Sequence, residues 1–197
     1  MCNLDVLRFA AYVFTDSSKE MIWTSEEGYK YKGKYPDVYT GIELLQLFIE
    51  NGDTAFPSCC LIFIKRETVE LNNLRFREGI IHEDNLFHWE LMSLSERTAV
   101  LNKPLYCRRL RNGSITQTPN WINKIRSMCV SAEEADAFIM FHPQIAGETS
   151  NWYFVFFINS IISSWFQMTP QMRASIHTKE YLRRAKLIAK NITSING

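Results

Sequence analysis

The stretch from Phe76 to Ser114 constrains this chain most, because it carries acidic residues in its first part and arginines in its last. An apolar pair at positions 80 and 81 predicts a short strand, after which three titratable residues lead into a helical pattern: His82, Glu83 and Asp84. A second apolar run then ends in a cluster of arginines: Arg108, Arg109 and Arg111. Carboxylates can accept a proton and guanidiniums can hold an anion, so this stretch indicates chemistry as well as packing.

Asp84 has two interpretations. It precedes apolar residues at helical spacing, and an acid at a helix start satisfies free amides and the helix dipole. From chemistry alone, this capping role is favoured. The alternative is a general base, because the adjacent carboxylate of Glu83 and burial would both raise the pKa of Asp84, although the helix dipole opposes that rise.

The two histidines of this stretch, His82 and His88, are expected to have different positions. His82 lies beside the predicted strand end and could join the two acids in a metal site, but such a site normally needs three or four converging ligands. We therefore favour a hydrogen-bonded structural role for His82. His88 lies further along the predicted helix, and we expect it on the surface.

The arginine cluster follows two predicted short strands, at residues 98–101 and 105–110, that flank Lys103-Pro104 and lead to an Asn112-Gly113 turn. In a regular strand Arg109 and Arg111 share a face, while Arg108 points the other way. Guanidinium groups bind phosphate oxygens in pairs, but arginines also protect a solvent-exposed sheet edge. Both interpretations stay open on chemistry alone.

The segments just described resemble the second half of the catalytic domain of family 2 glycosyltransferases. The similarity runs from about Leu4 to Thr116, is strongest in its second half, which contains the matching segments 73–84 and 101–115, and is weak beyond. It implies that Asp84, with Glu83 beside it, supplies the catalytic base. It also implies that His82, Ser114 and the arginine cluster lie near the donor diphosphate or the acceptor.

The resemblance further implies an inverting transfer from a nucleotide sugar to a saccharide or lipid-linked acceptor in bacterial cell-surface polysaccharide synthesis. Family members use Mg²⁺ or Mn²⁺, but the Asp-x-Asp ligand motif and the other donor-binding signatures are absent from this sequence. Met1 falls where the nucleotide-binding half should end. We therefore expect a fragment, one part of a split enzyme that works with a separate nucleotide-binding half, or a non-catalytic interaction module derived from the family.

The fold class expected is α/β: a partial GT-A-like mixed sheet with flanking helices at 1–117, followed by a helical region at 118–197. Five cysteines without a Cys-x-x-Cys pair argue against a disulfide framework or a structural zinc site. The start of the chain does not read as a signal peptide, so we expect a cytoplasmic protein. A formal net charge of +1 gives no indication of a nucleic-acid partner.

The first apolar run, Leu4 to Phe14, predicts a strand that is buried on both faces. If its usual neighbours are missing, the strand has an open edge, and we expect self-association or a partner there. The next segment, residues 25–39, is rich in Tyr, Lys and Gly. A solvated loop is favoured for it over a loop that stacks on a sugar or contacts phosphate.

Capping-box spacing at Thr40 and Glu43 predicts a scaffold helix that ends at Asn51-Gly52. A buried strand at 58–64 and a short helix at 66–72 should follow. Beyond Pro119 we expect helices only, with starts near 119, 131 and 169.

The segment 152–166 is strongly apolar, but polar residues interrupt it and it is too short to span a membrane. The last helix is basic and amphipathic. We favour a packed hairpin with a solvated basic face over contact with an anionic membrane surface, and the second interpretation would place the protein at the inner face of the membrane.

Overall fold

The computed structural model describes all residues except 1–2, 16–20, 22–28, 54–56, 112–119, 146 and 196–197. The chain forms two compact units, and each is described by itself. Unit 1 comprises Met1–Arg75 and Phe87–Thr118, and unit 2 comprises Phe76–Leu86 and Pro119–Gly197. The predicted division at 117 and 118 stays a prediction, whereas the predicted mixed α/β fold class is confirmed.

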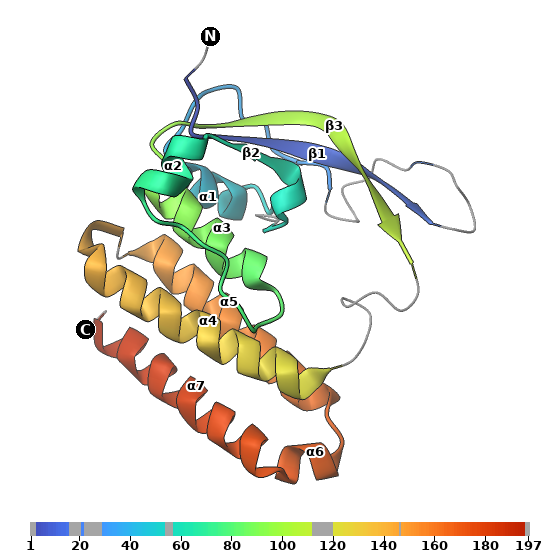
Figure 1. Ribbon diagram of the computed structural model, residues 1–197, viewed down its shortest axis with the longest axis vertical. Helices are drawn as coiled ribbons and strands as arrows, with labels where there is room; N and C mark the ends of the chain where they lie inside the picture. Colours follow the sequence, from blue (N-terminus) through green and yellow to red (C-terminus); the bar gives the residue numbers. More distant parts are fainter. Residues whose placement is uncertain are drawn as a thin grey trace. The chain divides into compact units, whose positions relative to one another are not determined.

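Unit 1 contains a three-stranded mixed sheet in the order β2-β1-β3 (Figure 1). Strand β1 (Val6–Thr15) lies at the centre, antiparallel to β2 (Ile62–Ile64) and parallel to β3 (Thr98–Leu110). The prediction of a buried first strand is confirmed, because residues on both of its faces are buried: Val6, Arg8, Phe9, Ala10, Ala11 and Val13. Among the described residues, β2 pairs with β1 only at Val6, Leu7 and Arg8, so the expected open edge, with self-association or a partner there, stays a prediction for the rest of β1.

Strand β3 is one long element, where the sequence predicted two short strands. Its pairing with β1 shifts register where Phe9 lies opposite Leu101 and Ala10 lies opposite Pro104. Proline has no amide hydrogen to give to the sheet, so the strand forms an irregularity there and then continues. The predicted strand at 58–64 is also shorter, because Cys59–Leu61 forms a 3-10 turn (η1) before β2.

Two helices of unit 1 follow the sequence closely. Helix α1 (Gly41–Glu50) begins with the predicted capping box, in which Thr40 Oγ1 accepts from the Glu43 amide and the Glu43 carboxylate accepts from the Thr40 amide. Helix α2 (Arg66–Leu71) is the predicted short helix.

Helix α3 (Glu83–Leu94) begins in unit 2 and continues into unit 1. The strand predicted at positions 80 and 81 is wrong, since these residues are irregular and lead into a bend at Ile81 and His82.

The tyrosines of the tyrosine-rich segment belong to the core of unit 1, so the exposed position expected for their side chains is wrong, whereas Lys32, Lys34 and residues 36–38 are exposed, as expected of a solvated loop. Tyr31 stacks on Phe48 with ring centroids 5.3 Å apart, and Tyr35 meets the same ring edge-on at 5.0 Å. Tyr29, Tyr31 and Tyr35 are all buried. The carboxylate of Asp53 fixes the segment by accepting from the amides of Lys32 and Gly33 and from the Tyr35 hydroxyl.

His88 is also buried, which corrects its predicted surface position. Its ring packs inside unit 1, where Nε2 accepts a hydrogen bond from the guanidinium of Arg8 on β1. The apolar spacing correctly predicts a helix around His88. Its burial depends on Arg8, which lies on a distant strand, so the local pattern does not indicate it.

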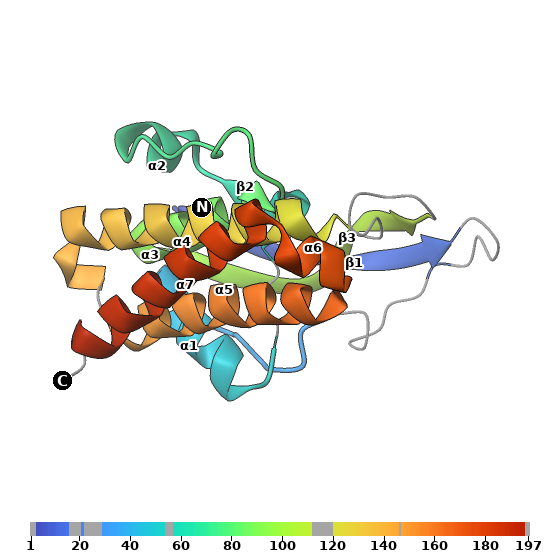
Figure 2. The ribbon, with the colours of Figure 1, turned by 90° about the horizontal axis from the view of Figure 1, so that it is seen from below.

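Unit 2 is helical beyond the acidic turn, as predicted. Helices α4 (Trp121–Phe141), α5 (Glu148–Gln167) and α7 (Ile176–Ile195) lie side by side (Figure 2), with the short α6 (Pro170–Ala174) before α7 and a 3-10 turn, η2 (Pro143–Ile145), after α4. The predicted helix start at Ser131 is wrong. Helix α4 is continuous there, and Ser131 is fully buried inside it.

The last predicted helix is divided, because Ser175 has an extended backbone between α6 and α7. The basic residues of α7 form ion pairs in part: Arg183 with Glu180 of the same helix, and Arg184 with Glu133 of α4. These pairs fit the favoured packed arrangement. Within the described part of the chain, no helix combines the length and the apolar character needed to cross a membrane.

Candidate active site

The acidic turn, defined here as His82, Glu83 and Asp84, lies where α3 begins in unit 2. Gly79 and His82 both have positive φ angles, of 75° and 61°, so the chain bends sharply before the helix. The amide of Asn85 donates to the His82 carbonyl at 3.1 Å, which closes the first helical turn. The bend places both carboxylates in the first turn of α3.

Helix α4 holds the backbone of the segment before the acidic turn. The Ile81 amide donates to Oγ of the fully buried Ser127 at 3.0 Å, and the Arg126 guanidinium donates to the Gly79 carbonyl. Fixed backbone atoms on both sides of the bend give the acidic turn a defined position within unit 2. A reactive group needs such support, because small displacements of catalytic groups are costly.

The half-buried carboxyl of Asp84 has a pKa of about 6, above its ordinary value. Burial is the main cause, and the neighbouring charge of Glu83 adds to it. The backbone amides of Asp84 and Asn85 oppose the rise, as expected at a helix start. At pH 7 the carboxylate is mostly ionised and can accept a proton, and a pKa near the working pH is favourable for a general base. The same amide contacts are those of the helix-capping interpretation, so the two roles are compatible.

The imidazole of His82 stays neutral at pH 7. Burial lowers its pKa first, and the positive charge of Lys124 on α4 lowers it further, while Glu83 acts in the opposite direction. A neutral imidazole can donate one hydrogen bond and accept another. His82 therefore suits the structural role favoured from the sequence.

The donor set of the acidic turn does not fit a divalent metal site. Mg²⁺ and Mn²⁺ prefer several converging oxygen ligands. Across the part of the chain that the structure describes, no group of three His, Cys, Asp or Glu side chains is arranged to hold a metal ion. The metal expected from the family resemblance stays a prediction, and no chemical step is assigned to it here.

The arginines lie at the end of β3, in unit 1. Arg108 and Arg109 pair with Val13 and Phe14 of β1, and the strand ends at Leu110, one residue before Arg111. The Arg108 guanidinium lies 4.8 Å from the centroid of the Tyr29 ring, a cation–π distance, and the side chain is half-buried.

Arg109 and Arg111 are exposed. Ser114 falls outside the described residues. Because the arginines belong to unit 1 and the acidic turn to unit 2, a shared site for the two groups stays a prediction.

Sequence reasoning missed Lys124, whose charge acts on the acidic turn, and the polar face of α5 that lines a pocket with it. A signal was present. Asn159, Ser160 and Ser163 interrupt the most apolar segment of the chain, and this interruption indicates a polar helix face as well as arguing against a membrane span.

The chain is similar in structure to TarS of S. aureus. The crystal structure of TarS 1–349 in complex with UDP-GlcNAc has a TM-score of 0.51 and 16% sequence identity, over 92% of this chain and 47% of that chain. The UDP complex of the same protein has a TM-score of 0.48 and 16% sequence identity, over 89% of this chain and 44% of that chain. By sequence, no protein-family model and no curated protein matches.

The likeness to the UDP-GlcNAc complex defines a glycosyltransferase-like fold for this chain, and at this level of identity it shows the fold alone. The chain spans about half the length of the TarS structure that it matches.

Proposed function

We propose that this chain is the acceptor-side part of a family 2 type glycosyltransferase. It would transfer a sugar from a nucleotide-sugar donor to a saccharide or lipid-linked acceptor, with inversion, in bacterial cell-surface polysaccharide synthesis. The observation that supports this best is the half-buried Asp84, with its pKa of about 6 at the start of α3, in a chain with a glycosyltransferase-like fold. A carboxyl group in that state suits proton removal from a hydroxyl group.

In the proposed reaction, Asp84 takes the proton of an acceptor hydroxyl while the acceptor oxygen attacks the anomeric carbon of the donor sugar. The bond from that carbon to the nucleoside diphosphate breaks, and its electron pair leaves with the diphosphate. A single displacement of this kind inverts the anomeric centre. Glu83 keeps the pKa of Asp84 raised, because two neighbouring carboxylates resist ionising together.

The leaving diphosphate needs positive charge, which the arginines can supply. We assign this role to Arg109 and Arg111, whose exposed guanidiniums can hold phosphate oxygens in pairs, with Arg108 and Ser114 as further contacts. Neutral His82 would hydrogen-bond to donor or acceptor. TarS was crystallised with UDP-GlcNAc and with UDP, and we carry a nucleotide-sugar donor over to this chain as part of the proposal.

The proposed partners are a separate nucleotide-binding half or a second copy of the chain. The proposed location is the cytoplasm, at the inner face of the membrane, where lipid-linked acceptors are presented. Exposed apolar residues on the last helices suit such a contact: Val155, Ile162, Phe166 and Leu187.

The experiment is a binding and release assay with the full chain. Nucleotide-sugar binding is measured by calorimetry with Mg²⁺ or Mn²⁺, and nucleoside diphosphate release is followed with water as the surrogate acceptor, before and after addition of a nucleotide-binding half from a family 2 enzyme. We expect release that Asp84→Asn abolishes and Asp136→Asn, a control on α4, retains.

The competing function is a non-catalytic interaction module. It predicts no thermal shift with any nucleotide sugar, no release in either mixture, and no change on Asp84→Asn. That set of results would contradict the transferase proposal.

A further inference from the structure

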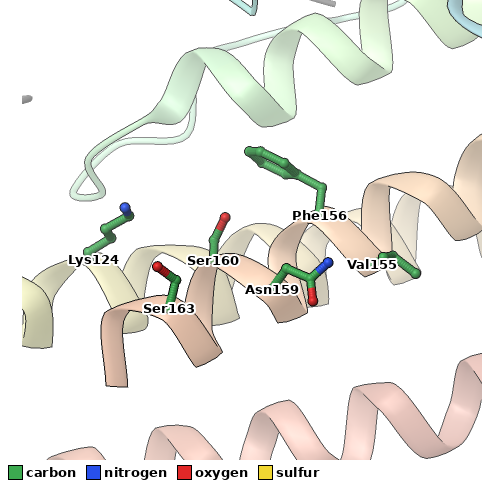
Figure 3. A pocket seen from close by; sticks show the side chains of 6 residues that line it. All are labelled: Lys124, Val155, Phe156, Asn159, Ser160 and Ser163. Atoms are coloured by element: carbon green, nitrogen blue, oxygen red, sulfur yellow. The ribbon is translucent and has the colours of Figure 1, made fainter. Parts of the chain in front are cut away.

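A pocket lies between α4 and α5, within unit 2. Its volume is about 340 Å³, and its lining combines apolar and polar side chains (Figure 3): Lys124, Val155, Phe156, Asn159, Ser160 and Ser163. This volume is at the lower end of the range for small-molecule sites, and it suits a ligand of about one sugar unit. The lining contains an ammonium group and no carboxylate.

The polar residues of α5 divide into two kinds. Ser164 is fully buried and donates to the Ser160 carbonyl at 2.7 Å, so its hydroxyl is used within the helix. The side chains of Asn159, Ser160 and Ser163 instead line the pocket. Residues three and four apart share one face of a helix, so this spacing concentrates hydrogen-bonding groups on one side of an otherwise apolar segment.

Lys124 connects the pocket with the acidic turn. Figure 3 shows its amino group extending from α4 toward the turn that precedes α3. Burial lowers the pKa of His82 most, and the positive charge of Lys124 lowers it further, which agrees with an ammonium group near the acidic turn. Among the described residues Lys124 takes part in no ion pair, and its recorded contact is with the ring of Trp121, 5.7 Å from Nζ. The ammonium group can therefore serve a ligand.

We propose that this pocket is the acceptor subsite, and that it takes a saccharide-type acceptor carrying a negatively charged group. The proposal rests on the proposed function, in which Asp84 deprotonates the acceptor. Lys124 would hold the anionic group, the amide of Asn159 and the hydroxyls of Ser160 and Ser163 would bind acceptor hydroxyls, and the ring of Phe156 would contact the apolar face of the sugar.

The test uses ligand-observed NMR titration of the full chain with three probes: glucose 6-phosphate, glucose and inorganic phosphate. We expect glucose 6-phosphate to bind at least tenfold more tightly than either simpler probe. Lys124→Gln should remove that advantage while leaving glucose binding unchanged, and Ser163→Val should weaken both sugars. Lys179→Gln, which removes an exposed lysine from α7, is the matched control and should bind like the wild type.

Three results would overturn the proposal. Equal affinity for glucose and glucose 6-phosphate would remove the anionic preference. Inorganic phosphate bound as tightly as the sugar phosphate would indicate a simple anion site. UDP is titrated in parallel, and a loss of UDP binding in Lys124→Gln as large as the loss of glucose 6-phosphate binding would assign the pocket to the donor.

This test is separable from that of the proposed function. Asp84→Asn should keep glucose 6-phosphate binding and lose transfer, whereas Lys124→Gln should lose binding of the anionic probe. If transfer fails but glucose 6-phosphate binds as expected, the pocket assignment is supported and the assignment of Asp84 as the base is contradicted. If the probe does not bind but Asp84 is required for release, only the pocket assignment falls.

Discussion

The guanidinium of Arg8 on β1 donates a hydrogen bond to Nε2 of His88 on α3, and both side chains are fully buried in unit 1. Arg8 also donates to the Tyr31 hydroxyl at 3.2 Å and lies 5.3 Å from the centroid of the Phe48 ring. A neutral imidazole is the only form that can accept from an arginine. Burial, and then the charge of Arg8, lower the pKa of His88 well below its usual range.

This pair predicts that acid destabilises unit 1. Because the pKa of His88 is lowered in the folded state, the unfolded chain binds the proton more readily. The contribution of neutral His88 to the free energy of unfolding is therefore complete above about pH 6.5 and is lost as the pH falls below it. Urea unfolding between pH 4 and 8 measures the effect. His88→Gln, which accepts but does not titrate, should flatten the profile in that range relative to wild type. An equally steep acid limb in His88→Gln would contradict the assignment, and His177→Gln, at an exposed position, is the control.

Gly41 predicts a steric effect in unit 1. A Cβ atom at this position would lie 1.9 Å from the Met92 carbonyl oxygen, a backbone atom that cannot move aside alone. We expect Gly41→Ala to lower the free energy of unfolding by about 3 kcal/mol or more, because the first turn of α1 and the end of α3 must separate. Chemical denaturation measures it. Gln46→Ala, on the exposed face of the same helix, should be nearly neutral, and similar losses in both variants would contradict the close-packing explanation.

We expect the hydrogen bond between Tyr35 and Asp53 to contribute to the stability of unit 1. Its hydroxyl donates to Asp53 Oδ2 at 2.5 Å, and burial together with that carboxylate raises the pKa of Tyr35. Tyr35→Phe keeps the ring against Phe48 but leaves Asp53 with one bond fewer, so we expect a loss of about 1–3 kcal/mol in stability. Tyr106→Phe, at an exposed tyrosine, is the comparison. An unchanged midpoint for Tyr35→Phe would show that the Asp53 contact contributes nothing.

Asp84 predicts a stability change of opposite sign to that of His88. Its pKa is raised from 3.8 to about 6 in the folded chain, so the folded state holds the proton more tightly and stability falls as the pH rises between these values. Above pH 6, Asp84→Asn should therefore stabilise unit 2, by about 1 kcal/mol once solvent screening of this partly exposed group is allowed for. Below pH 4 the gain should vanish. A stabilisation that persists unchanged at pH 3.5 would rule out the titration of Asp84 as its cause.

Local patterns predicted the elements whose cause is local. The capping box at Thr40 and the apolar run of β1 depend on residues close in sequence, and both are confirmed. The burial of His88 and Tyr31 depends on partners from distant segments, Arg8 and Phe48, so no local pattern could indicate it. Ser131 shows the reverse error: a capping-box spacing occurs inside α4, where tertiary packing buries the serine and the helix continues.

The sequence indicates the acidic turn as a candidate site because two adjacent carboxylates precede a helical pattern. The catalytic role of Asp84 stays a prediction, and its raised pKa is compatible with that role. The position of Lys124 was not predictable, since it depends on how α4 packs against the segment before α3 in unit 2.

The most direct test of the account is nucleoside diphosphate release from nucleotide sugars, with water as acceptor, by the wild-type chain and by Asp84→Asn in the presence of a nucleotide-binding half. We predict that Asp84→Asn lowers the rate by about 10²- to 10⁴-fold, and that the wild-type rate falls as the pH drops below about 6, where the Asp84 carboxylate takes up a proton. Equal rates for the two proteins would contradict the assignment of Asp84 as the base. So would a release rate that the wild-type chain does not raise above that of the nucleotide-binding half alone.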